Sequence, residues 1–428
     1  MGSGGVLDQL RVPVVQAPMA GGPSTPALAA AVSEAGGLGF LAAGYRTAAA
    51  VHDDIVAVRA ATDRPFGVNV FVPTPDRVDR SLLAGYVERV RREAVTYRCA
   101  TGDAVWGDDG WEEKLATLVV ERPPVVSVAF GCPGAEVIGR LHGAGIEVWV
   151  TVTEPAEAEA ATAAGADALV AQGIEAGAHR GAFSDVDGVG EIGLLTLLRL
   201  VARVTDLPLI ASGGLCDGAG VAAVLVGGAR AAQLGTAFLD TPEAGTSAPH
   251  RAALRGGRRT LLTRAFSGRR ARGIVNGFLA RNTALAPAAY PHVVGLTAPL
   301  RSAARERDDP EMLNLWAGQT LCGRRSGTGE GGICGARWSG CEVLCVLRAR
   351  GGRVARCCAI RGRAAVGLRG ALRSADAWRP HTGPALTLGL FHQPPVATPI
   401  GRPSAVSKRR SPSAVRRISY SPSWCRLW

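Results

Sequence analysis

Eight short apolar segments alternate with alanine-rich helical segments between Val12 and Phe238, and this alternation constrains the fold more than any other feature. Because each segment is apolar on both faces, it is typical of a strand in a parallel sheet that is covered on both sides. Eight such strands in about 240 residues predict a closed (β/α)₈ barrel, the TIM barrel. The alternative is an open doubly wound sheet, which is disfavoured because no Gly-rich dinucleotide fingerprint follows the first strand.

The expected strands are Val12–Ala17, Leu38–Ala43, Phe66–Val72, Val125–Phe130, Glu147–Val152, Ala168–Ala171, Leu207–Ala211 and Ala231–Leu234. The expected helices between them include Pro26–Ala35, Ala48–Ala61, Ala135–Gly143, Pro155–Ala164, Ile192–Val204 and Gly218–Val226.

The expected barrel domain spans residues 1–319 and carries two additions. The connection 73–124 is the longest and holds two helical stretches, so we expect an α-helical insertion after the third strand. Long insertions commonly lie on the active-site side of a barrel, and a surface hairpin is an equal alternative. Residues 247–319 are expected to form a C-terminal helical segment, and 308–319 are expected to be a helix that approaches its end.

Beyond Gln319 the composition changes abruptly. Residues 321–428 hold 19 Lys and Arg against 3 Asp and Glu, a net charge of +16, whereas residues 1–320 carry a net charge of −4. Seven of the ten cysteines also lie in this part, and no helical or strand periodicity is visible. We therefore expect 320–428 to be a disordered Arg/Cys-rich tail. Its composition is also that of a GC-rich coding sequence read in the wrong frame, and we interpret it as an aberrant extension.

The overall charge of +12 is therefore no argument for nucleic-acid binding. The excess of basic over acidic residues lies in the tail, which lacks interleaved aromatic residues and any known nucleic-acid-binding module. No run of about 18 apolar residues predicts a membrane span. Met1–Gln9 does not resemble a signal peptide, and Cys99, Cys132 and Cys216 are too scattered for a disulfide framework. We expect a cytoplasmic protein.

The residues at the ends of the expected strands are the candidates for function, because the active sites of barrels lie there. Strand 3 contains Asn69 within an apolar run, and a buried amide must be hydrogen-bonded, either to a ligand or to a neighbouring loop. Strand 6 ends at Gln172, and the glycine-rich loop that follows contains Gly177 and His179. A histidine there can accept a proton or donate a hydrogen bond. The first strand ends in a Pro- and Gly-rich loop against which a flat ring could lie, and its residues are Ala17, Pro18 and Met19.

Strands 7 and 8 both end in glycine-containing turns. In a barrel, the loops after these two strands commonly present backbone N–H groups to a phosphate. The hydroxyl of Thr236 could add a further donor. The candidate residues are Ser212, Gly213 and Gly214 after strand 7, and Gln233, Leu234, Gly235 and Thr236 at the end of strand 8.

Together these residues predict a site for a planar ring that carries one phosphate. FMN fits better than pyridoxal phosphate, because the single lysine of the barrel region, Lys114, lies in the insertion and is badly placed for a Schiff base. No cluster of His, Asp and Glu has metal-ligand spacing, so we expect no metal site.

Several motifs together resemble bacterial nitronate monooxygenases, also called 2-nitropropane dioxygenases. The likeness covers residues 10–319, and its most specific motif is Leu262–Arg269. The matching segments are Ala17–Gly22, Glu34–Gly39, Asn69, Gln172–Gly181, Ser212–Gly214, Gln233–Thr236, Leu262–Arg269, Ala271–Gly273 and Asn276. The resemblance implies that Asn69, Gln172, Gly177, Gly214 and Gln233–Thr236 contact FMN and that His179 lies beside the reactive edge of the flavin. One departure stands beside it: the family commonly has Gly-Gly-His where this chain has Gly177-Ala178-His179, and alanine tolerates fewer backbone conformations than glycine.

The resemblance also implies a reaction, the FMN-dependent oxidation of alkyl nitronates by O₂ to carbonyl compounds and nitrite. His179 would donate a hydrogen bond to the nitro group, or remove the α-proton if the substrate is a neutral nitroalkane. The expected partners are this small substrate and O₂, with no specific nucleic acid and no membrane, and the protein is expected to be a monomer or homodimer. Two alternatives stay open: an NAD(P)H-dependent FMN reductase of the quinone or enoyl-thioester type, and an inactive flavoprotein from a frameshifted gene.

Overall fold

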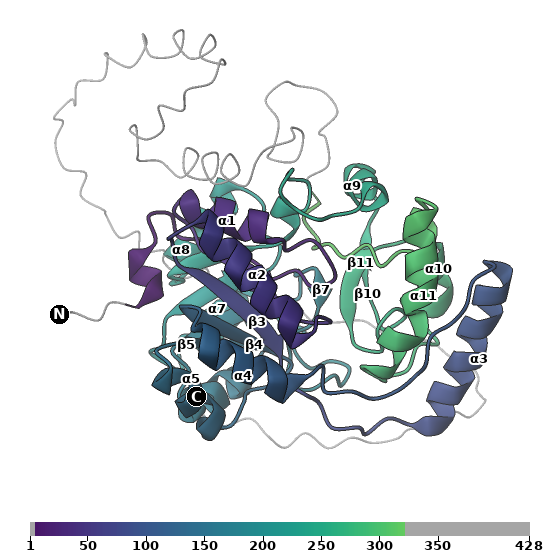
Figure 1. The fold of residues 1–428 in the computed structure, drawn as a ribbon, viewed down its shortest axis with the longest axis horizontal. Helices are drawn as coiled ribbons and strands as arrows, with labels where there is room; N and C mark the ends of the chain where they lie inside the picture. Colours follow the sequence, from purple (N-terminus) through teal and green to yellow (C-terminus); the bar gives the residue numbers. More distant parts are fainter. Residues whose placement is uncertain (1–4, 322–428) are drawn as a thin grey trace, which may run out of the picture. The chain divides into compact units, whose positions relative to one another are not determined.

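The computed structural model describes residues 5–321 and contains an eight-stranded parallel barrel (Figure 1). The strand order is β1-β9-β8-β6-β5-β4-β3-β2. The ring closes because Leu38 N donates to Val14 O at 3.0 Å and Gln16 N donates to Leu38 O at 2.9 Å. This closure confirms the TIM barrel and rejects the open sheet. All eight expected strands are present, as β1 (Val14–Gln16), β2 (Gly39–Ala42), β3 (Phe66–Phe71), β4 (Val125–Ala129), β5 (Glu147–Val152), β6 (Ala168–Gln172), β8 (Leu209–Ser212) and β9 (Ala231–Leu234).

Successive residues of the strands pack into two different cores. Val14 belongs to the layer between barrel and helices, whereas its neighbour Val15 points into the barrel interior beside Phe40 and Trp149. This alternation is the two-residue period of a strand. Both faces are buried, which explains why each strand is continuously apolar in sequence. Gly67 in β3 belongs to this interior, because a Cβ there would collide with the ring of Phe40.

Helices surround the barrel much as the sequence predicts. They are α1 (Pro26–Glu34), α2 (Ala48–Ala61), α4 (Trp111–Glu121), α5 (Ala135–Gly143), α6 (Pro155–Ala164), α7 (Leu194–Val201) and α8 (Gly218–Val226). The side chains of Thr25, Thr47 and Asp217 cap the first turns of α1, α2 and α8, which is the usual N-cap chemistry.

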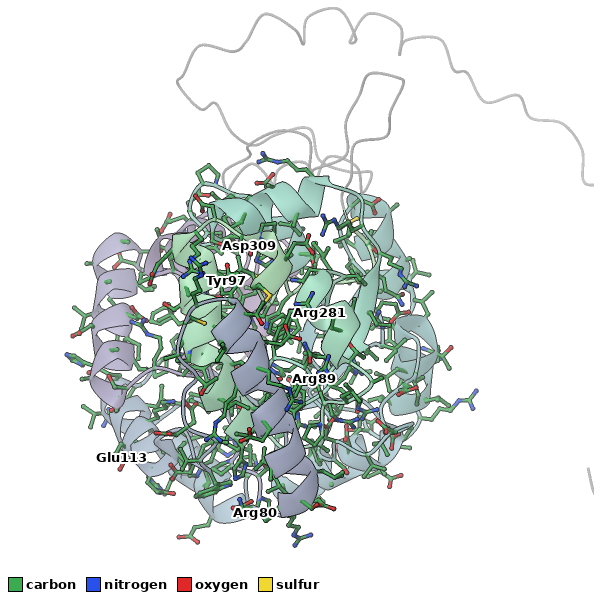
Figure 2. The ribbon with its side chains drawn as sticks, turned by 90° about the vertical axis from the view of Figure 1, so that its right-hand side faces the viewer. Arg80, Arg89, Tyr97, Glu113, Arg281 and Asp309 are labelled. Atoms are coloured by element: carbon green, nitrogen blue, oxygen red, sulfur yellow. The ribbon has the colours of Figure 1, made fainter. Side chains whose placement is uncertain are left out.

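The two helices of the connection 73–124 have different roles. The second, α4, contacts α2 and α5 and is the ring helix that follows β3. The first, α3 (Arg80–Thr96), packs on the C-terminal part of the domain (Figures 1 and 2). The Tyr97 hydroxyl donates to Asp309 Oδ2 at 2.9 Å, and Arg89 Nη2 donates to the carbonyl of Arg281 at 2.8 Å. The part of this connection that lies outside the helical ring is thus an extension that stabilises the C-terminal segment.

Residues 247–321 contain the expected helices and also a hairpin that the sequence analysis did not predict. The helices are α9 (Ala248–Arg255), α10 (Gly277–Asn282) and α11 (His292–Glu306). The hairpin consists of β10 (Thr260–Thr263) and β11 (Ala271–Ile274), and β11 pairs with β7 (Ala178–His179) in the loop after β6. A second hydrophobic core, which includes Phe266, Phe278 and Leu296, lies under these elements.

The prediction of a helix at 308–319 is wrong. A single 3₁₀ turn, Pro310–Met312, is followed by an extended segment up to Leu321. The side-chain amide of Asn276 donates to the carbonyls of both Pro310 and Leu313 at 2.7 Å, so these carbonyls are bonded outside any helix. The expected tail lies outside the described residues except for Thr320 and Leu321. Within residues 5–321, no helix is long and apolar enough to cross a membrane, and no group of three or more His, Cys, Asp or Glu could hold a metal ion.

Candidate active site

A cavity of about 430 Å³ lies at the C-terminal ends of the barrel strands, within the size range of small-molecule sites. The structure brings thirteen of the fourteen predicted site residues to its wall. They are Ala17, Pro18, Met19, Asn69, Gln172, Gly177, His179, Ser212, Gly213, Gly214, Gln233, Gly235 and Thr236. The exception is Leu234, whose side chain is buried in the layer between barrel and helices.

One end of the cavity, which we call the glycine end, is formed by the turns after β8 and β9. Gly213 and Gly214 have φ angles of +117° and +68°, a region that side chains rarely adopt. A Cβ on Gly214 would lie 2.9 Å from Cβ of Glu175. Within residues 5–321, the backbone N–H groups of Gly213, Gly214 and Gly235 have no hydrogen-bond partner. Such a concentration of unpaired donors is suited to a phosphate.

The extended segment 313–321 crosses this glycine end, and we call it the C-terminal strap. Gly318 N donates to Thr236 Oγ1 at 2.9 Å, and the Thr320 hydroxyl donates to the carbonyl of Gly214 at 2.7 Å. A Cβ on Gly177 would lie 2.5 Å from backbone atoms of Ala317 and Gly318. Gly177 therefore admits the strap to the cavity wall. The sequence analysis missed this cover because it expected a helix here.

The three amide side chains that the sequence predicts for the site have different partners. The Asn69 Nδ2 donates to the carbonyl and hydroxyl of Ser127 at 3.1 and 2.9 Å, while no described group donates to its Oδ1. Asn69 is thus held by a neighbouring strand and can still accept from a ligand. Gln172 uses both ends on its own loop, because Nε2 donates to the carbonyl of His179 and Oε1 accepts from Gly181 N. Gln233 donates to the Ser212 hydroxyl at 3.2 Å.

His179 is held by the C-terminal hairpin. Its Nε2 lies 2.8 Å from the Ser267 hydroxyl, which is also 3.1 Å from the carbonyl of Arg269. The hydroxyl has one proton for these two acceptors, so Ser267 determines which ring nitrogen of His179 carries hydrogen. Burial, with the charges of Arg269 and Arg301, lowers the pKa of His179 to about 3. The imidazole is therefore neutral at physiological pH. Ser267 was missed as a site residue, although it lies in the motif Leu262–Arg269.

Aromatic rings surround His179. The centroids of Phe130, Tyr290 and Trp316 lie 5.7, 5.9 and 5.6 Å from that of the imidazole. The guanidinium carbon of Arg269 lies 4.1 Å from the centroid of Phe130, a cation–π contact. These rings exclude water from one side of His179, which is the physical cause of its depressed pKa.

Three non-glycine residues of the cavity wall have left-handed backbone conformations. They are Tyr45, Phe130 and Ala178, with φ angles of 65°, 75° and 59°. Each costs about 1–2 kcal/mol, and such strain is concentrated at functional sites. At Ala178 the structure has the left-handed conformation that glycine adopts without strain, at the position where the resemblance implies glycine.

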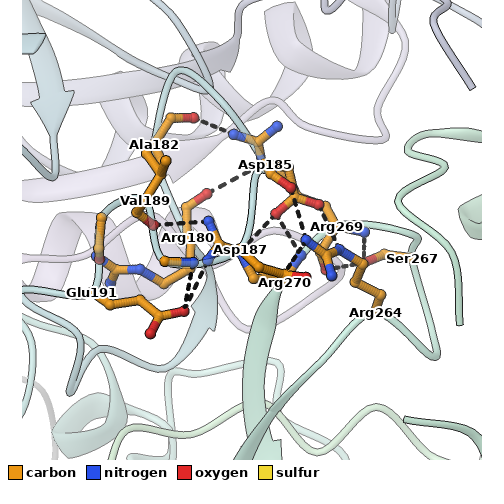
Figure 3. Close-up of polar contacts among 12 residues, drawn as sticks. Arg180, Ala182, Asp185, Asp187, Val189, Glu191, Arg264, Ser267, Arg269 and Arg270 are labelled. Carbon is orange, nitrogen blue, oxygen red and sulfur yellow. Dashed lines mark hydrogen bonds and ion pairs between the residues drawn. The ribbon is translucent and has the colours of Figure 1, made fainter. Parts of the chain in front are cut away.

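Buried arginines fasten the loop between β6 and α7 (Figure 3). The guanidinium of Arg180 donates to three backbone carbonyls of this loop, from Gln172, Gly173 and Gly190, at 2.6–2.8 Å. Arg270 pairs with Asp185 and Glu191 at 3.0 Å. These two cations hold the loop, and neither of them lines the cavity.

Residues 6–327 match the family model described as nitronate monooxygenase. The chain is 42% identical over 323 residues to a nitronate monooxygenase of Paraburkholderia phytofirmans, covering 73% of this chain and 88% of that one. It is 42% identical over 321 residues to one of Pseudomonas aeruginosa, covering 72% and 91%.

Among solved structures, a nitroalkane oxidase from Streptomyces ansochromogenes is 48% identical, with a TM-score of 0.75 and coverage of 81% of this chain and 97% of that chain. FabK from Thermotoga maritima is 26% identical, with a TM-score of 0.61 and coverage of 81% and 95%. The similarity thus includes both the barrel and the C-terminal segment that holds His179.

Proposed function

The chain belongs to the nitronate monooxygenase family, and we propose its activity from that membership and from the geometry of the cavity. The chain is an oxidoreductase of that family and oxidises nitronates. In the reaction we propose, an alkyl nitronate and O₂ give a carbonyl compound and nitrite. The resemblance seen in the sequence is confirmed by these relatives.

The family implies a flavin, and we propose that it is FMN. The cavity supports one phosphate at the glycine end, where Gly213, Gly214 and Gly235 present unpaired N–H groups. Two further polar groups could bond the ring system of FMN or its hydroxyl-bearing side chain. They are Asn69 Oδ1, to which no described group donates, and Thr246 Oγ1, which is buried without a partner. When bound, the flavin supplies the electron acceptor for the nitronate and passes electrons on to O₂.

The observation that decides between a nitronate and a neutral nitroalkane is the absence of a strong base. No Asp, Glu or Lys of residues 5–321 lines the cavity. The two histidines that line it, His179 and His250, have pKa values lowered by burial to about 3 and about 4. A group with so low a pKa is a poor proton acceptor at neutral pH. The substrate that this cavity suits therefore arrives already deprotonated.

His179 then acts by hydrogen bonding. A neutral imidazole can donate from one nitrogen only, and Ser267 determines which one. We propose the tautomer in which the Ser267 hydroxyl donates to Nε2 rather than to the carbonyl of Arg269, so that Nδ1–H is available to an oxygen of the nitronate. The aromatic rings of Phe130, Tyr290 and Trp316 exclude water around this hydrogen bond and so strengthen it.

Purified protein tests the proposal. It should be yellow, release FMN and no FAD on denaturation, consume O₂ when ethyl nitronate is added, and form nitrite. NADH and NADPH should not support steady-state turnover. A protein that binds no flavin, or that oxidises NADH with a quinone while ignoring nitronates, would contradict it.

A further inference from the structure

The charged side chains on the cavity wall all have the same sign. Among residues 5–321, the ionised groups that line it are Arg301 and Arg305, with no carboxylate. The part of the chain before the tail carries a net charge of −4, so this positive lining is a local feature. It requires an explanation at the site itself.

The side chain of Arg301 lies along α11 toward the start of that helix. Its Nε donates to the Thr297 hydroxyl at 3.2 Å, and its Nη2 donates to the carbonyl of Val294 at 2.9 Å. These partners precede Arg301 by four and seven residues, which is the direction in which helical side chains lean. The guanidinium is thereby brought toward Tyr45 and His179, whose pKa values it influences through its charge.

Arg301 has no acidic partner. Within residues 5–321, no carboxylate oxygen lies within 4.0 Å of its nitrogens, and no described group accepts from its Nη1. Two neighbouring arginines differ in this respect, because Arg264 and Arg270 pair with Asp185. Arg180 donates to backbone carbonyls (Figure 3). Arg301 lines the cavity, unlike these three.

A charge that is partly withdrawn from water without a counter-ion is costly, and the side chain of Arg301 is only partly exposed. Burial lowers the pKa of Arg301 to about 10, so the side chain is still charged at neutral pH. After burial and the charge of Arg269, the charge of Arg301 further lowers the pKa of His179. An anion bound beside Arg301 would satisfy the Nη1 hydrogens and remove the electrostatic cost of the unpaired cation.

We propose that Arg301 binds the negatively charged nitro group of the substrate and so selects the nitronate anion over the neutral nitroalkane. This inference rests on the proposed function. A nitronate has two oxygens in one plane, which match the planar fork of a guanidinium as a carboxylate does. His179 and Arg301 would then bind the same group, one through a neutral donor and the other through a charged one.

The test compares Arg301→Gln and Arg301→Lys with the wild-type enzyme, all loaded with flavin. Losing a hydrogen bond to a charged group costs about 1.5–3 kcal/mol, so Arg301→Gln should raise the KM for ethyl nitronate about 10- to 100-fold. Arg301→Lys keeps the positive charge but lacks the planar guanidinium fork, so its KM for ethyl nitronate should lie between those of the wild type and Arg301→Gln. Arg91→Gln removes an exposed charge on α3 that pairs with Glu88 and serves as the matched control.

Binding of nitrate supplies a readout that does not depend on turnover. Like a nitronate, nitrate is a planar anion whose negatively charged oxygens are bonded to nitrogen. Its dissociation constant, measured by its effect on the flavin absorbance, should rise in Arg301→Gln by a similar factor and not in Arg91→Gln. Flavin content and melting temperature show that each variant is folded, and Arg301→Lys provides a second route if Arg301→Gln is unstable.

The possible outcomes separate the inference from the function on which it rests. If wild-type enzyme turns over ethyl nitronate and both KM and nitrate binding are unchanged in Arg301→Gln, the role of Arg301 is wrong and the function stands. An effect confined to nitronates that carry a second acidic group would also overturn the inference. If the wild-type holoenzyme does not oxidise any nitronate, the proposed function itself fails.

Discussion

The barrel wall and the C-terminal segment 247–321 contribute differently to one cavity. The ends of β8 and β9 supply the glycine end, with backbone donors that any phosphate could use. The C-terminal segment supplies Ser267, Arg301 and Trp316, which lie near His179 at what we call the substrate end of the cavity. We therefore propose that the barrel strands provide most of the cofactor site, whereas the C-terminal segment positions His179 and contributes to the choice of substrate.

The largest expected effect follows from removing the C-terminal strap. A chain that ends at Asp309 lacks Trp316, Gly318 and Thr320, and should lose flavin and turnover entirely. A chain that ends at Leu321 should retain both at the full-length level, because we predict that the tail does not contribute to activity. The cut belongs after Leu321 and not after Gln319, since the Thr320 hydroxyl bonds the carbonyl of Gly214. Flavin absorbance per protein checks this, and loss of flavin on truncation at Leu321 would show that the tail is a structural part.

The next effect tests the glycine end. Gly214→Leu should give protein without flavin, because its side chain would collide with Glu175 and block the approach of a phosphate. Gly257→Leu is the matched control, since Gly257 has nearly the same φ, +67°, with nothing within 4 Å of an added Cβ. Retention of stoichiometric FMN by Gly214→Leu would place the phosphate elsewhere.

A smaller effect is expected at the substrate end. His179→Asn should keep flavin, because the backbone of His179 and the loop bonds of Gln172 are unchanged. Turnover of ethyl nitronate should fall about 10- to 100-fold through the loss of a hydrogen bond to a charged group. Ser267→Ala removes the hydroxyl that determines which ring nitrogen of His179 carries hydrogen, so turnover of ethyl nitronate should fall by a smaller factor. Equal rates in wild type and His179→Asn would remove this residue from the mechanism.

The smallest effect concerns strain next to His179. Ala178→Gly relieves a left-handed alanine, worth about 1–2 kcal/mol, and adds about 0.4–1 kcal/mol of unfolded-state entropy. The net result should be a slight stabilisation in a denaturant titration. Ala160→Gly, at an exposed site inside the ordinary helix α6, should instead destabilise by about 0.5–1 kcal/mol. If both variants destabilise equally, Ala178 is not strained.

The two regions also differ in how well their sequence predicts them. The barrel strands are buried on both faces, so their apolar runs are visible without neighbours, and only their ends shift, as in Leu209–Ser212 against the expected Leu207–Ala211. The hairpin β10–β11 has no such pattern. Its second strand contains Arg272, whose guanidinium donates to the carbonyl of Ile174 far along the chain. Because a charged residue of this strand bonds to a distant part of the chain, the alternation of apolar and polar residues that marks a strand is not visible in the local sequence.

The same reasoning applies to the site. Strand-end glycines and His179 stand out because barrels concentrate function at strand ends. Arg301 lies in a helix with Arg305 and Arg307 nearby, and the sequence does not tell which arginine faces a cavity. Ser267 and the strap are likewise recognisable only when distant segments are brought together. The interpretation of the tail as a frameshift product stays a prediction.

The central claim, that this cavity takes a substrate already deprotonated, is tested most directly with freshly dissolved neutral nitroethane. Because His179 has a pKa of about 3, it stays neutral from pH 6 to 9, and kcat with ethyl nitronate should show no inflection in that range. Nitroethane should be consumed no faster than it ionises spontaneously in the buffer, whatever the enzyme concentration. A rate that rises in proportion to enzyme and exceeds the spontaneous ionisation would show that the protein removes the α-proton itself, and would contradict the account.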